Sequence, residues 1–338
     1  MTSPQCLVLT MGEPAGIGPD VTLGVWRDRD RLHVPAFYCL ADPDVLRSRA
    51  GELGLKVPIE TVSPADAAAC FGRALPVVPL EARVAAKAGR LESANGRGVI
   101  EAIARGVGYL RDGSALAIVT NPINKRALYD AGFRHPGHTE FLGALAETWA
   151  AGPVRPVMML AAPELRTVPV TIHIALAEVA RTLTAALIAE TARVVVHDLR
   201  RRFAIARPRV AVAALNPHAG EGGAMGNEDD TIVRPAVETL RGEGIDVRGP
   251  LPADTMFHAA ARATYDAALC MYHDQALIPV KTLAFAEAVN LTLGLPFVRS
   301  SPDHGTALDI AGTGKADPAS LAAALRLAAQ LAANEAAA

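Results

Sequence analysis

The chain has 338 residues, enough for two domains of ordinary size or for one large domain. Hydrophobic residues make up 51% of it and aromatic residues only 4%, so a core has to be built mainly from Ala, Val, Leu and Ile. The net charge of −2, with acidic and basic residues interspersed, excludes the basic surface that binding to nucleic acid or to an anionic membrane requires.

Nothing in the sequence indicates export or membrane insertion. The N-terminal residues lack the basic and apolar regions of a signal peptide, and no run of about 18 apolar residues predicts a membrane span. Cys6, Cys39, Cys70 and Cys270 form no CxxC pair, which fits reduced thiols in a cytosol. We therefore expect a cytoplasmic protein with no nucleic acid or membrane as its partner.

Short apolar runs alternate with helical stretches along most of the chain. The predicted strands cover residues 7–9, 37–40, 115–119, 157–160, 210–213 and 268–271. Helical patterns cover residues 178–202, 229–241 and 321–338, and Asp317-Pro318 supplies an N-cap and a first-turn proline to the last of them. This alternation predicts a largely parallel α/β sheet that is covered on both faces.

Polar residues gather where several predicted strands end, which is the edge at which open α/β sheets bind ligands. The clusters are Thr120-Asn121-Pro122, Asn216-Pro217-His218, Tyr272-His273-Asp274-Gln275 and the glycine-rich loop 12–18. Loop 12–18 contains neither GxGxxG nor a Walker lysine. It is either a phosphate cradle or a tight strand-to-helix turn, and its glycines fit both.

His173, His218 and His273 are the candidate metal ligands. A catalytic zinc site typically uses three protein ligands and keeps one position open. The separations of 45 and 55 residues match no compact zinc motif, and each histidine taken alone is equally read as an isolated polar residue near a strand end. Because two of the three follow predicted strands directly, a shared metal site remains a hypothesis beside that simpler interpretation.

Two further segments carry groups that suit an anion. Gly137-His138-Thr139-Glu140 precedes a helix that we expect to run to about Trp149, so His138 or Thr139 either caps this helix or leaves its N–H groups for a ligand. Lys281, Asn290 and Arg299 lie after His273 and are nine residues apart from one another. They either bind phosphate or carboxylate or are solvated surface groups. Residues 303–314 form a second glycine-rich loop, which either holds an adenosine moiety or only connects two elements.

Six segments together resemble the 4-hydroxythreonine-4-phosphate dehydrogenase family. They begin with Met11-Gly12-Glu13-Pro14-Ala15-Gly16-Ile17-Gly18-Pro19 and end with Leu293-Gly294-Leu295-Pro296-Phe297-Val298-Arg299. Between them lie Thr120-Asn121-Pro122-Ile123-Asn124-Lys125, Gly137-His138-Thr139-Glu140-Phe141-Leu142, Ala214-Leu215-Asn216-Pro217-His218-Ala219-Gly220-Glu221 and Met271-Tyr272-His273-Asp274-Gln275. The likeness runs from about residue 5 to residue 325.

The resemblance implies the isocitrate/isopropylmalate dehydrogenase-like fold, with two α/β/α domains and a central cleft. The expected division is a cofactor-side domain of residues 1–130 with 300–338, and a metal, substrate and dimerisation domain of residues 131–299. Members are homodimers that complete each metal site from both subunits, so a homodimer with shared active sites is implied here.

The resemblance also implies roles for individual residues. The metal ligands are His173, His218 and His273, holding Zn, Mg or Co. The substrate contacts are His138, Thr139, Lys281, Asn290 and Arg299. His304, Gly305, Thr306 and Ala307 match the His-Gly-Thr-Ala loop that binds NAD or NADP in place of GxGxxG. Asp254, Asp274 and Lys281 are the candidates for the general base.

The implied reaction oxidises 4-phosphohydroxythreonine at C3 to 2-amino-3-oxo-4-phosphooxybutanoate, which decarboxylates to 3-amino-2-oxopropyl phosphate in pyridoxal 5′-phosphate biosynthesis. Three alternatives stay open. A sister dehydrogenase acting on 4-phosphothreonate or 4-phosphoerythronate would use much the same residues. A phosphate acyltransferase shares the superfamily fold but needs no catalytic metal. The third is a metabolite-binding protein without catalysis.

Overall fold

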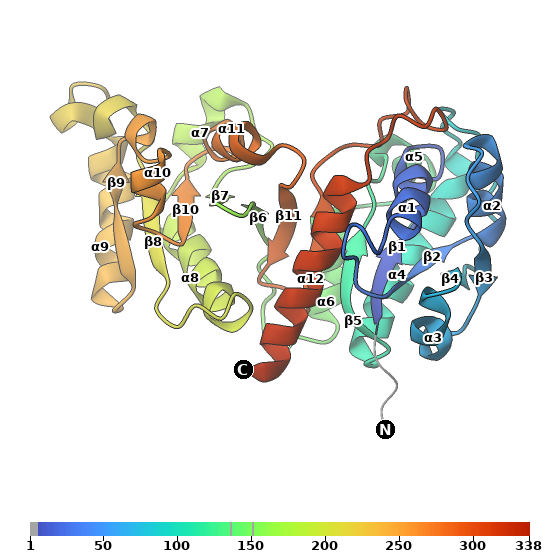
Figure 1. Ribbon diagram of the computed structural model, residues 1–338. Coiled ribbons are helices and arrows are strands. Elements are labelled where there is room, and N and C mark those ends of the chain that lie inside the picture. The colour runs from blue at the N-terminus through green and yellow to red at the C-terminus, as the bar shows by residue number, and fades with distance from the viewer. Residues whose placement is uncertain (1–5, 136, 151) are drawn as a thin grey trace. The chain divides into compact units, whose positions relative to one another are not determined.

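The computed structural model describes residues 6–135, 137–150 and 152–338. The chain divides into two compact units (Figure 1). Unit 1 contains the described residues up to Pro156 together with Leu295–Ala333, and unit 2 contains Val157–Gly294 and Asn334–Ala338. The described residues between 131 and 156, which the expected division assigns to the second domain, belong to unit 1.

Unit 1 is built on a parallel sheet with the described strand order β3-β4-β2-β1-β5-β12. The strands are β1 (Cys6–Thr10), β2 (Phe37–Ala41), β3 (Ile59–Thr61), β4 (Leu75–Pro79), β5 (Ala115–Thr120) and β12 (Arg299–Pro302). The helices are α1 (Gly18–Arg27), α2 (Pro43–Glu52), α3 (Ala67–Phe71), α4 (Gly96–Arg111), α5 (Lys125–Asp130), α6 (His138–Glu147) and α12 (Ala319–Ala337), with short 3-10 turns at Pro64–Asp66 and Ser93–Asn95. The last four residues of α12 belong to unit 2.

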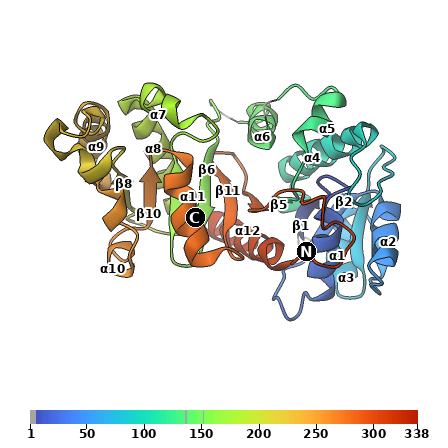
Figure 2. The same ribbon diagram turned by 90° about the horizontal axis from the view of Figure 1, so that it is seen from above.

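Helices cover both faces of this sheet. Helix α4 lies on one face, and α1, α2 and α12 lie on the other (Figure 2). All five positions of β1 and of β2 are buried, as continuous apolar strands between two helical layers require. The prediction of a parallel sheet with two covered faces is confirmed for unit 1.

Unit 2 contains a mixed sheet with the described order β11-β6-β7-β10-β8-β9. The strands are β6 (Val157–Ala161), β7 (Arg166–Pro169), β8 (Arg209–Ala213), β9 (Asp246–Leu251), β10 (Ala267–Cys270) and β11 (Val289–Leu293). The helices are α7 (Leu176–Thr182), α8 (Ala185–Arg201), α9 (Arg234–Gly242), α10 (Ala259–Arg262) and α11 (His273–Ala284), with 3-10 segments η3 (Pro217–Gly223) and η5 (Ala253–Thr255) and a π-helical turn at Asp229–Val233. Strands β7, β10, β8 and β9 are parallel, whereas β6 runs antiparallel to both β7 and β11.

One predicted helix is interrupted. The pattern at residues 178–202 predicts a single helix, but the structure has α7 and α8 with extended backbone at Leu183 and Thr184 between them. The Thr184 hydroxyl accepts a hydrogen bond from the Leu187 amide at 3.0 Å and so caps α8. Thr184 lies within the helical pattern of apolar residues and starts a second helix there. Its side chain satisfies a backbone N–H that the first turn of a helix leaves unpaired.

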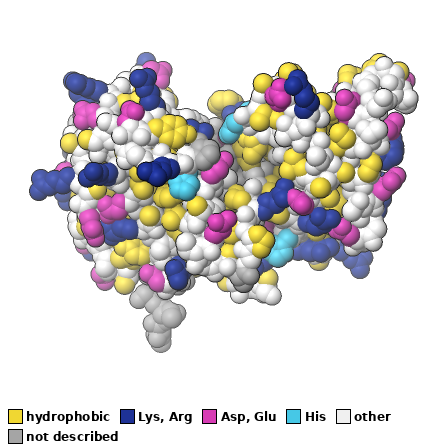
Figure 3. Space-filling view, turned by 180° about the vertical axis from the view of Figure 1, so that it is seen from behind, with side chains coloured by type: hydrophobic (Ala, Val, Ile, Leu, Met, Phe, Trp, Pro, Cys, Tyr) yellow, Lys and Arg dark blue, Asp and Glu magenta, His cyan; other side chains and the backbone are white. Residues whose placement is uncertain are grey.

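The surface agrees with the charge balance of the sequence. On the face in Figure 3, Lys and Arg side chains are interspersed with Asp and Glu, without a large region of one sign.

The four cysteines are buried and unpaired. In residues 6–135, 137–150 and 152–338, no helix has the length and apolar character that a membrane crossing needs.

A buried ion pair in unit 2 fixes the end of α8. Arg202 Nη1 lies 3.0 Å from Asp198 Oδ2, and Asp198 also accepts a hydrogen bond from the Gly294 amide at 3.0 Å. The two side chains are 4% and 2% exposed. Burial raises the pKa of Asp198 and Arg202 opposes this shift, so the carboxylate depends on its partner.

We expect Arg202→Ala to lower the free energy of unfolding by about 3–5 kcal/mol, because it leaves a buried carboxylate without its cation. Urea unfolding followed by circular dichroism measures the change. Arg201→Ala is the matched control, since Arg201 is 52% exposed and pairs with Glu335 at 3.0 Å at the surface. The control is expected to cost less than about 1 kcal/mol. Equal losses in the two variants would contradict the assigned role of the buried pair.

Candidate functional site

In unit 2, two predicted metal ligands are brought together by neighbouring parallel strands. Pro169 at the end of β7 is in register with Cys270 at the end of β10. The pairing continues past both strands, because the Thr171 amide and hydroxyl both donate to the Met271 carbonyl, at 3.2 and 2.8 Å. His173 and His273 each follow two residues later, and their ring centroids lie 5.8 Å apart.

The His273 imidazole has a carboxylate partner. Asp274 Oδ1 lies 2.7 Å from His273 Nδ1. This contact favours the tautomer with the proton on Nδ1 and leaves Nε2 as an acceptor, the arrangement found in metal-binding histidines with a supporting carboxylate. One of the three candidate bases, Asp274, is therefore placed to orient His273. The donor set around His173 and His273 fits a divalent ion.

His218 lies beyond the end of β8, which is the next strand after β10 in the sheet. Gln275 links the two segments, because its Oε1 accepts from the Met271 amide at 2.6 Å and its Nε2 donates to the Ala214 carbonyl at 2.7 Å. Asp229 fixes the His218 segment from the other side. Its Oδ1 accepts a hydrogen bond from the Leu215 amide at 2.7 Å, and its Oδ2 accepts one from the Asn216 amide at 2.9 Å.

The backbone of residues 218–222 forms a left-handed turn. All five residues have positive φ, including 51° at His218, 55° at Ala219 and 44° at Glu221. Each non-glycine residue in this region costs about 1 kcal/mol or more. The amides of Leu215 and Asn216, just before the turn, donate to Asp229 and fix the start of this segment. Strain of this kind is concentrated at functional sites, which adds support to a role for His218.

The three histidines do not form a complete cluster in one chain. Within the described part of the chain, no three His, Cys, Asp or Glu side chains lie close enough to hold a metal ion together. His173 and His273 thus offer two neighbouring imidazoles, and among the described residues no third His, Cys, Asp or Glu lies close enough to complete a metal site with them.

Helix α11 carries both His273 and Lys281. A hollow of about 370 Å³ runs along it and is lined by His273, Asp274, Leu277, Ile278, Lys281 and Thr282. The spacing of four residues from His273 to Leu277 and again to Lys281 puts these side chains on one face of the helix. Of the other predicted residues in unit 2, Asn290 is half-buried on β11, and Asp254 is exposed in η5, which packs against the His218 segment.

In unit 1, Arg299 is a buried cation at the start of β12. It is 5% exposed and lies on β12, beside β5. Its Nε and Nη2 atoms both donate to Thr120 Oγ1, at 3.2 and 2.7 Å. Burial lowers the pKa of Arg299 to about 10, which leaves the guanidinium charged at neutral pH. A buried, charged guanidinium fits a bound carboxylate or phosphate.

His138 and Thr139 are the first two residues of α6. The N-cap is Gly137, and no side chain caps the helix, so the interpretation of His138 or Thr139 as a cap is wrong. The Nε2 atom of His138 is buried and makes no hydrogen bond with the described residues. Burial and the nearby charge of Arg299 hold the pKa of His138 well below its usual value. His138 is therefore neutral at pH 7 and has an unused ring nitrogen beside a helix N-terminus that can receive an anion.

The predicted nucleotide loop lies in unit 1 after β12. His304 Nδ1 is 3.1 Å from the Gly305 carbonyl, and the buried His304 Nε2 makes no hydrogen bond with any described residue. Ala307 has a φ of 42°, in the left-handed region. A Cβ added to Gly305 would meet no atom within 4 Å. Gly305 thus faces open space and leaves room for a ligand to approach the backbone.

Loop 12–18 is entirely buried, so it does not present a phosphate cradle at the surface. A Cβ on Gly16 would lie 2.7 Å from the Thr306 carbonyl oxygen, and a Cβ on Gly18 would lie 2.6 Å from the Met11 carbonyl oxygen. The tight-turn interpretation of these glycines is confirmed. Asn121 is equally structural, because its amide donates to the Thr10 carbonyl and to the Thr22 hydroxyl, at 3.1 and 3.0 Å.

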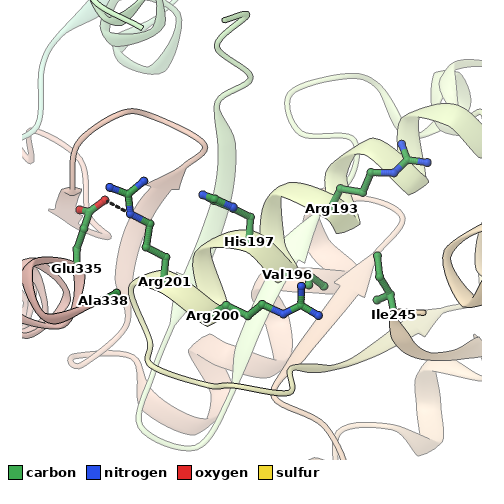
Figure 4. Close-up of a pocket in the computed structure, with 8 residues that line it drawn as sticks. All are labelled: Arg193, Val196, His197, Arg200, Arg201, Ile245, Glu335 and Ala338. Carbon is green, nitrogen blue, oxygen red and sulfur yellow. Dashed lines mark ion pairs between the residues drawn. The ribbon is translucent and has the colours of Figure 1, made fainter. Parts of the chain in front are cut away.

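A second hollow in unit 2 contains none of the predicted site residues. Its volume is about 710 Å³, and α8 contributes Arg193, His197, Arg200 and Arg201 to its lining (Figure 4). Arg193 pairs with Glu243 at 2.6 Å and Arg201 pairs with Glu335 at 3.0 Å. These carboxylates offset most of the positive charge, so the hollow does not have the electrostatics of an anion site.

Sequence reasoning missed Thr120 and Gln275 as positioning residues, although both lie in polar clusters that it singled out. It also missed Arg49 and Asp20, which lie inside helices α2 and α1. A charged residue in a helix normally points to solvent. No sequence signal distinguishes these two from solvated surface charges.

Comparison with known sequences gives close relatives over nearly the whole chain. The 4-hydroxythreonine-4-phosphate dehydrogenase of Bradyrhizobium diazoefficiens is 56% identical over 335 residues, with 97% of each chain covered. The protein of the same description from Methylorubrum populi is 57% identical over 328 residues, covering 96% of this chain and 94% of the relative.

Solved structures give the same result for the fold. The 4-hydroxythreonine-4-phosphate dehydrogenase from Klebsiella pneumoniae superposes with a TM-score of 0.85 at 36% identity and covers 97% of this chain and 98% of its own. A branched-chain phosphotransacylase from Enterococcus faecalis shares the fold alone, with a TM-score of 0.55 at 11% identity and with 96% of this chain and 99% of its own covered. The predicted isocitrate/isopropylmalate dehydrogenase-like α/β fold is confirmed.

The family comparison covers most of the chain. The sequence model described as "Pyridoxal phosphate biosynthetic protein PdxA" matches residues 33–328, which include His138, the three histidines in unit 2 and the loop at His304. With this match and more than half of the residues identical to the two relatives, the chain belongs to the PdxA family of pyridoxal phosphate biosynthetic proteins.

Proposed function

We propose that this protein is an NAD(P)-dependent dehydrogenase that oxidises 4-phosphohydroxythreonine at C3 in pyridoxal 5′-phosphate biosynthesis. The single observation that carries the proposal is the identity of 56% and 57% to relatives named 4-hydroxythreonine-4-phosphate dehydrogenase, over 97% and 96% of this chain. Oxidation at C3 breaks the C3–H and O–H bonds. A bound NAD or NADP would accept the hydride, and a base of this chain accepts the C3 hydroxyl proton. The product is a β-keto acid. It then loses CO₂ as the C1–C2 bond breaks and its electron pair moves toward the C3 ketone to form an enolate, and protonation at C2 gives 3-amino-2-oxopropyl phosphate.

The residues of unit 2 support a divalent-metal site. His173 and His273 lie at 5.8 Å between ring centroids, and the Asp274 contact directs Nε2 of His273 away from its carboxylate. We propose that these two imidazoles hold the ion and that His218 of the partner subunit is the third ligand in a homodimer. A bound Zn, Co or Mg ion would supply Lewis acidity toward the C3 oxygen of the substrate.

The buried groups of unit 1 support an anion subsite. Thr120 fixes the Arg299 guanidinium through two hydrogen bonds, so the cation is oriented before a ligand arrives. His138 and Thr139 at the start of α6 add a neutral ring nitrogen and uncapped backbone amides. We assign the phosphate or the carboxylate of the substrate to this set. Lys281 and Asn290 are also proposed as substrate contacts.

Lys281 and Asp254 are the other two candidates for the general base. Lys281 shares a hollow with His273, and Asp254 lies in η5 beside the His218 segment. Either side chain is proposed to accept the C3 hydroxyl proton. Asp274 is proposed to orient His273 instead. The His304–Ala307 segment is proposed to bind NAD or NADP, and the protein is proposed to act in the cytoplasm.

A substrate panel tests the proposed function. Purified protein with Zn²⁺, Co²⁺ or Mg²⁺ is incubated with NAD or NADP and with 4-phosphohydroxythreonine, 4-phosphothreonate or 4-phosphoerythronate, and reduction is followed at the NADH absorbance. The expected result is the highest kcat/KM with 4-phosphohydroxythreonine, together with release of one CO₂ per reduced cofactor. A higher kcat/KM with either sugar acid, or reduction without CO₂ release, would assign the protein to the sister activity.

A further inference from the structure

A buried ion pair in unit 1 joins the two glycine-rich loops. Arg49 on α2 and Asp20 on α1 form an ion pair through Arg49 Nη1 and Asp20 Oδ2, with side chains that are 2% and 3% exposed. Helices α1 and α2 run side by side (Figures 1 and 2). Burying two full charges is costly unless each one is well paired and hydrogen-bonded, so the other partners of this pair show what it holds.

Arg49 holds loop 12–18. Its Nη1 donates to the Gly16 carbonyl at 2.9 Å, its Nη2 donates to the Pro14 carbonyl at 3.2 Å, and its Nε donates to Glu52 Oε2 at 3.1 Å. The planar guanidinium thus fixes two carbonyls of the loop that connects β1 to α1.

Asp20 holds the far end of the predicted nucleotide loop. Its Oδ1 accepts a hydrogen bond from the Gly312 amide at 2.7 Å. Gly312 has a φ of +72°, and a Cβ at this position would lie 2.8 Å from Ala88 Cβ. Glycine is required there both for its backbone conformation and for the close approach.

Loop 12–18 in turn fixes the near end of the nucleotide loop. The Ile17 amide donates to the Thr306 carbonyl at 2.9 Å, and Gly16 packs against the same carbonyl. Residues 304–314 are therefore held at Thr306 through loop 12–18 and at Gly312 through Asp20. Both connections lead back to the Arg49–Asp20 pair.

We infer that Arg49 and Asp20 are positioning residues for the nicotinamide nucleotide, acting through the shape of residues 304–314. This inference rests on the proposed cofactor role of the His304–Ala307 segment. A loop that is already ordered loses less conformational entropy when it binds its ligand, so the pair is expected to strengthen cofactor binding and to leave substrate affinity unchanged. The chemical class of ligand is a dinucleotide that contacts the exposed side of the loop at Gly305.

The experiment measures NADH binding by fluorescence on the intact protein. Asp20→Ala removes the acceptor of the Gly312 amide and is expected to raise the Kd for NADH about tenfold. Asp20→Asn keeps an oxygen in that place and is expected to stay within about threefold of the wild type. Gly312→Ala perturbs the same end of the loop without leaving a buried charge unpaired. It is expected to raise the Kd for NADH about as much as Asp20→Ala does.

Two readouts separate positioning from general stability. In turnover, the KM for the nicotinamide cofactor should rise in Asp20→Ala, while kcat at saturating cofactor and the KM for 4-phosphohydroxythreonine stay within about twofold. Arg202→Ala is the matched control, because it breaks an equally buried ion pair in unit 2. The Kd of Arg202→Ala for NADH should remain within about twofold of the wild-type value, although its loss of stability is comparable to that of Asp20→Ala.

The results distinguish the inference from the proposed function. If the wild-type protein binds no NADH and no NADPH, the proposed cofactor role and this inference both fail. If the wild type binds NADH and Asp20→Ala and Gly312→Ala bind it equally well, only the inference fails. The inference also fails if Arg202→Ala weakens NADH binding as much as Asp20→Ala does.

Discussion

Removal of divalent metal is expected to abolish turnover, and Zn²⁺, Co²⁺ or Mg²⁺ is expected to restore it. His173→Ala, His218→Ala and His273→Ala should each lower kcat by at least about 10³-fold, because loss of the ion removes several kcal/mol of charge stabilisation from the transition state. Metal content by mass spectrometry and NADH absorbance measure the two effects. Full activity in His218→Ala after exhaustive chelation would refute the metal site.

Asp274→Asn probes the orientation of His273 without removing a ligand. The amide keeps an oxygen near His273 Nδ1 but loses the charge, so metal affinity is expected to fall about 10- to 100-fold. Isothermal titration calorimetry with Zn²⁺ or Co²⁺ measures the metal affinity independently of enzymatic activity. Unchanged metal affinity with a large loss of kcat would return Asp274 to the role of general base.

Mixing inactive variants tests the shared site of the proposed homodimer. His173 and His273 are neighbours in one chain, so each of their alanine variants disables the same site. Heterodimers of His173→Ala with His273→Ala are therefore expected to stay inactive. Heterodimers of His218→Ala with His273→Ala should regain one competent site, because one chain supplies His173 and His273 and the other supplies His218. Equal inactivity of both mixtures would show that His218 does not act across the interface.

Arg299→Ala is expected to raise the KM for the substrate about 10- to 150-fold. This is the effect of losing a charge-assisted contact worth about 1.5–3 kcal/mol. Arg299→Lys keeps the charge but loses the planar fork, so it should be impaired as well. Lys281→Ala is expected to act in the same direction. The Kd for NADH should stay within about twofold of wild type in all three variants.

Thr120 provides the matched control for Arg299. Thr120→Ser keeps the hydroxyl that accepts both guanidinium hydrogen bonds and should behave like wild type. Thr120→Val removes this acceptor and should raise the substrate KM while the arginine remains present. If Arg299→Ala weakened NADH binding as much as it raised the substrate KM, Arg299 would belong to the nucleotide site instead.

The sequence by itself determined the parts of the fold that depend on local pattern. Continuous apolar runs such as those at β1 and β2 appear as buried strands, because only a strand between two helical layers needs apolar residues on both faces. Asp317 and Pro318 predict the start of α12, and Asp317 Oδ1 accepts the Ala319 amide at 2.9 Å. Local signals of this kind do not depend on distant residues.

Strands with polar residues were not predictable in the same way. Strand β12 reads Arg-Ser-Ser-Pro and is buried at all four positions, although its composition is typical of a loop. Arg299 is buried because Thr120 on the adjacent strand accepts its hydrogen bonds, and the Ser300 hydroxyl donates to the Ala324 carbonyl at 3.0 Å. The partners that make burial favourable lie 179 and 24 residues away in the chain.

The candidate site shows the same division. The sequence and its resemblance selected His173 and His273, but only the register of β7 with β10 decided that the two rings lie 5.8 Å apart. The glycines of loop 12–18 fitted a phosphate cradle as well as a turn, and only the burial of this loop under Thr306 decided between them. Arg49 and Asp20 gave no signal in the sequence. Their role follows from contacts across 29 and 292 residues, because a charge inside a protein is placed by its partners and not by its neighbours in the chain.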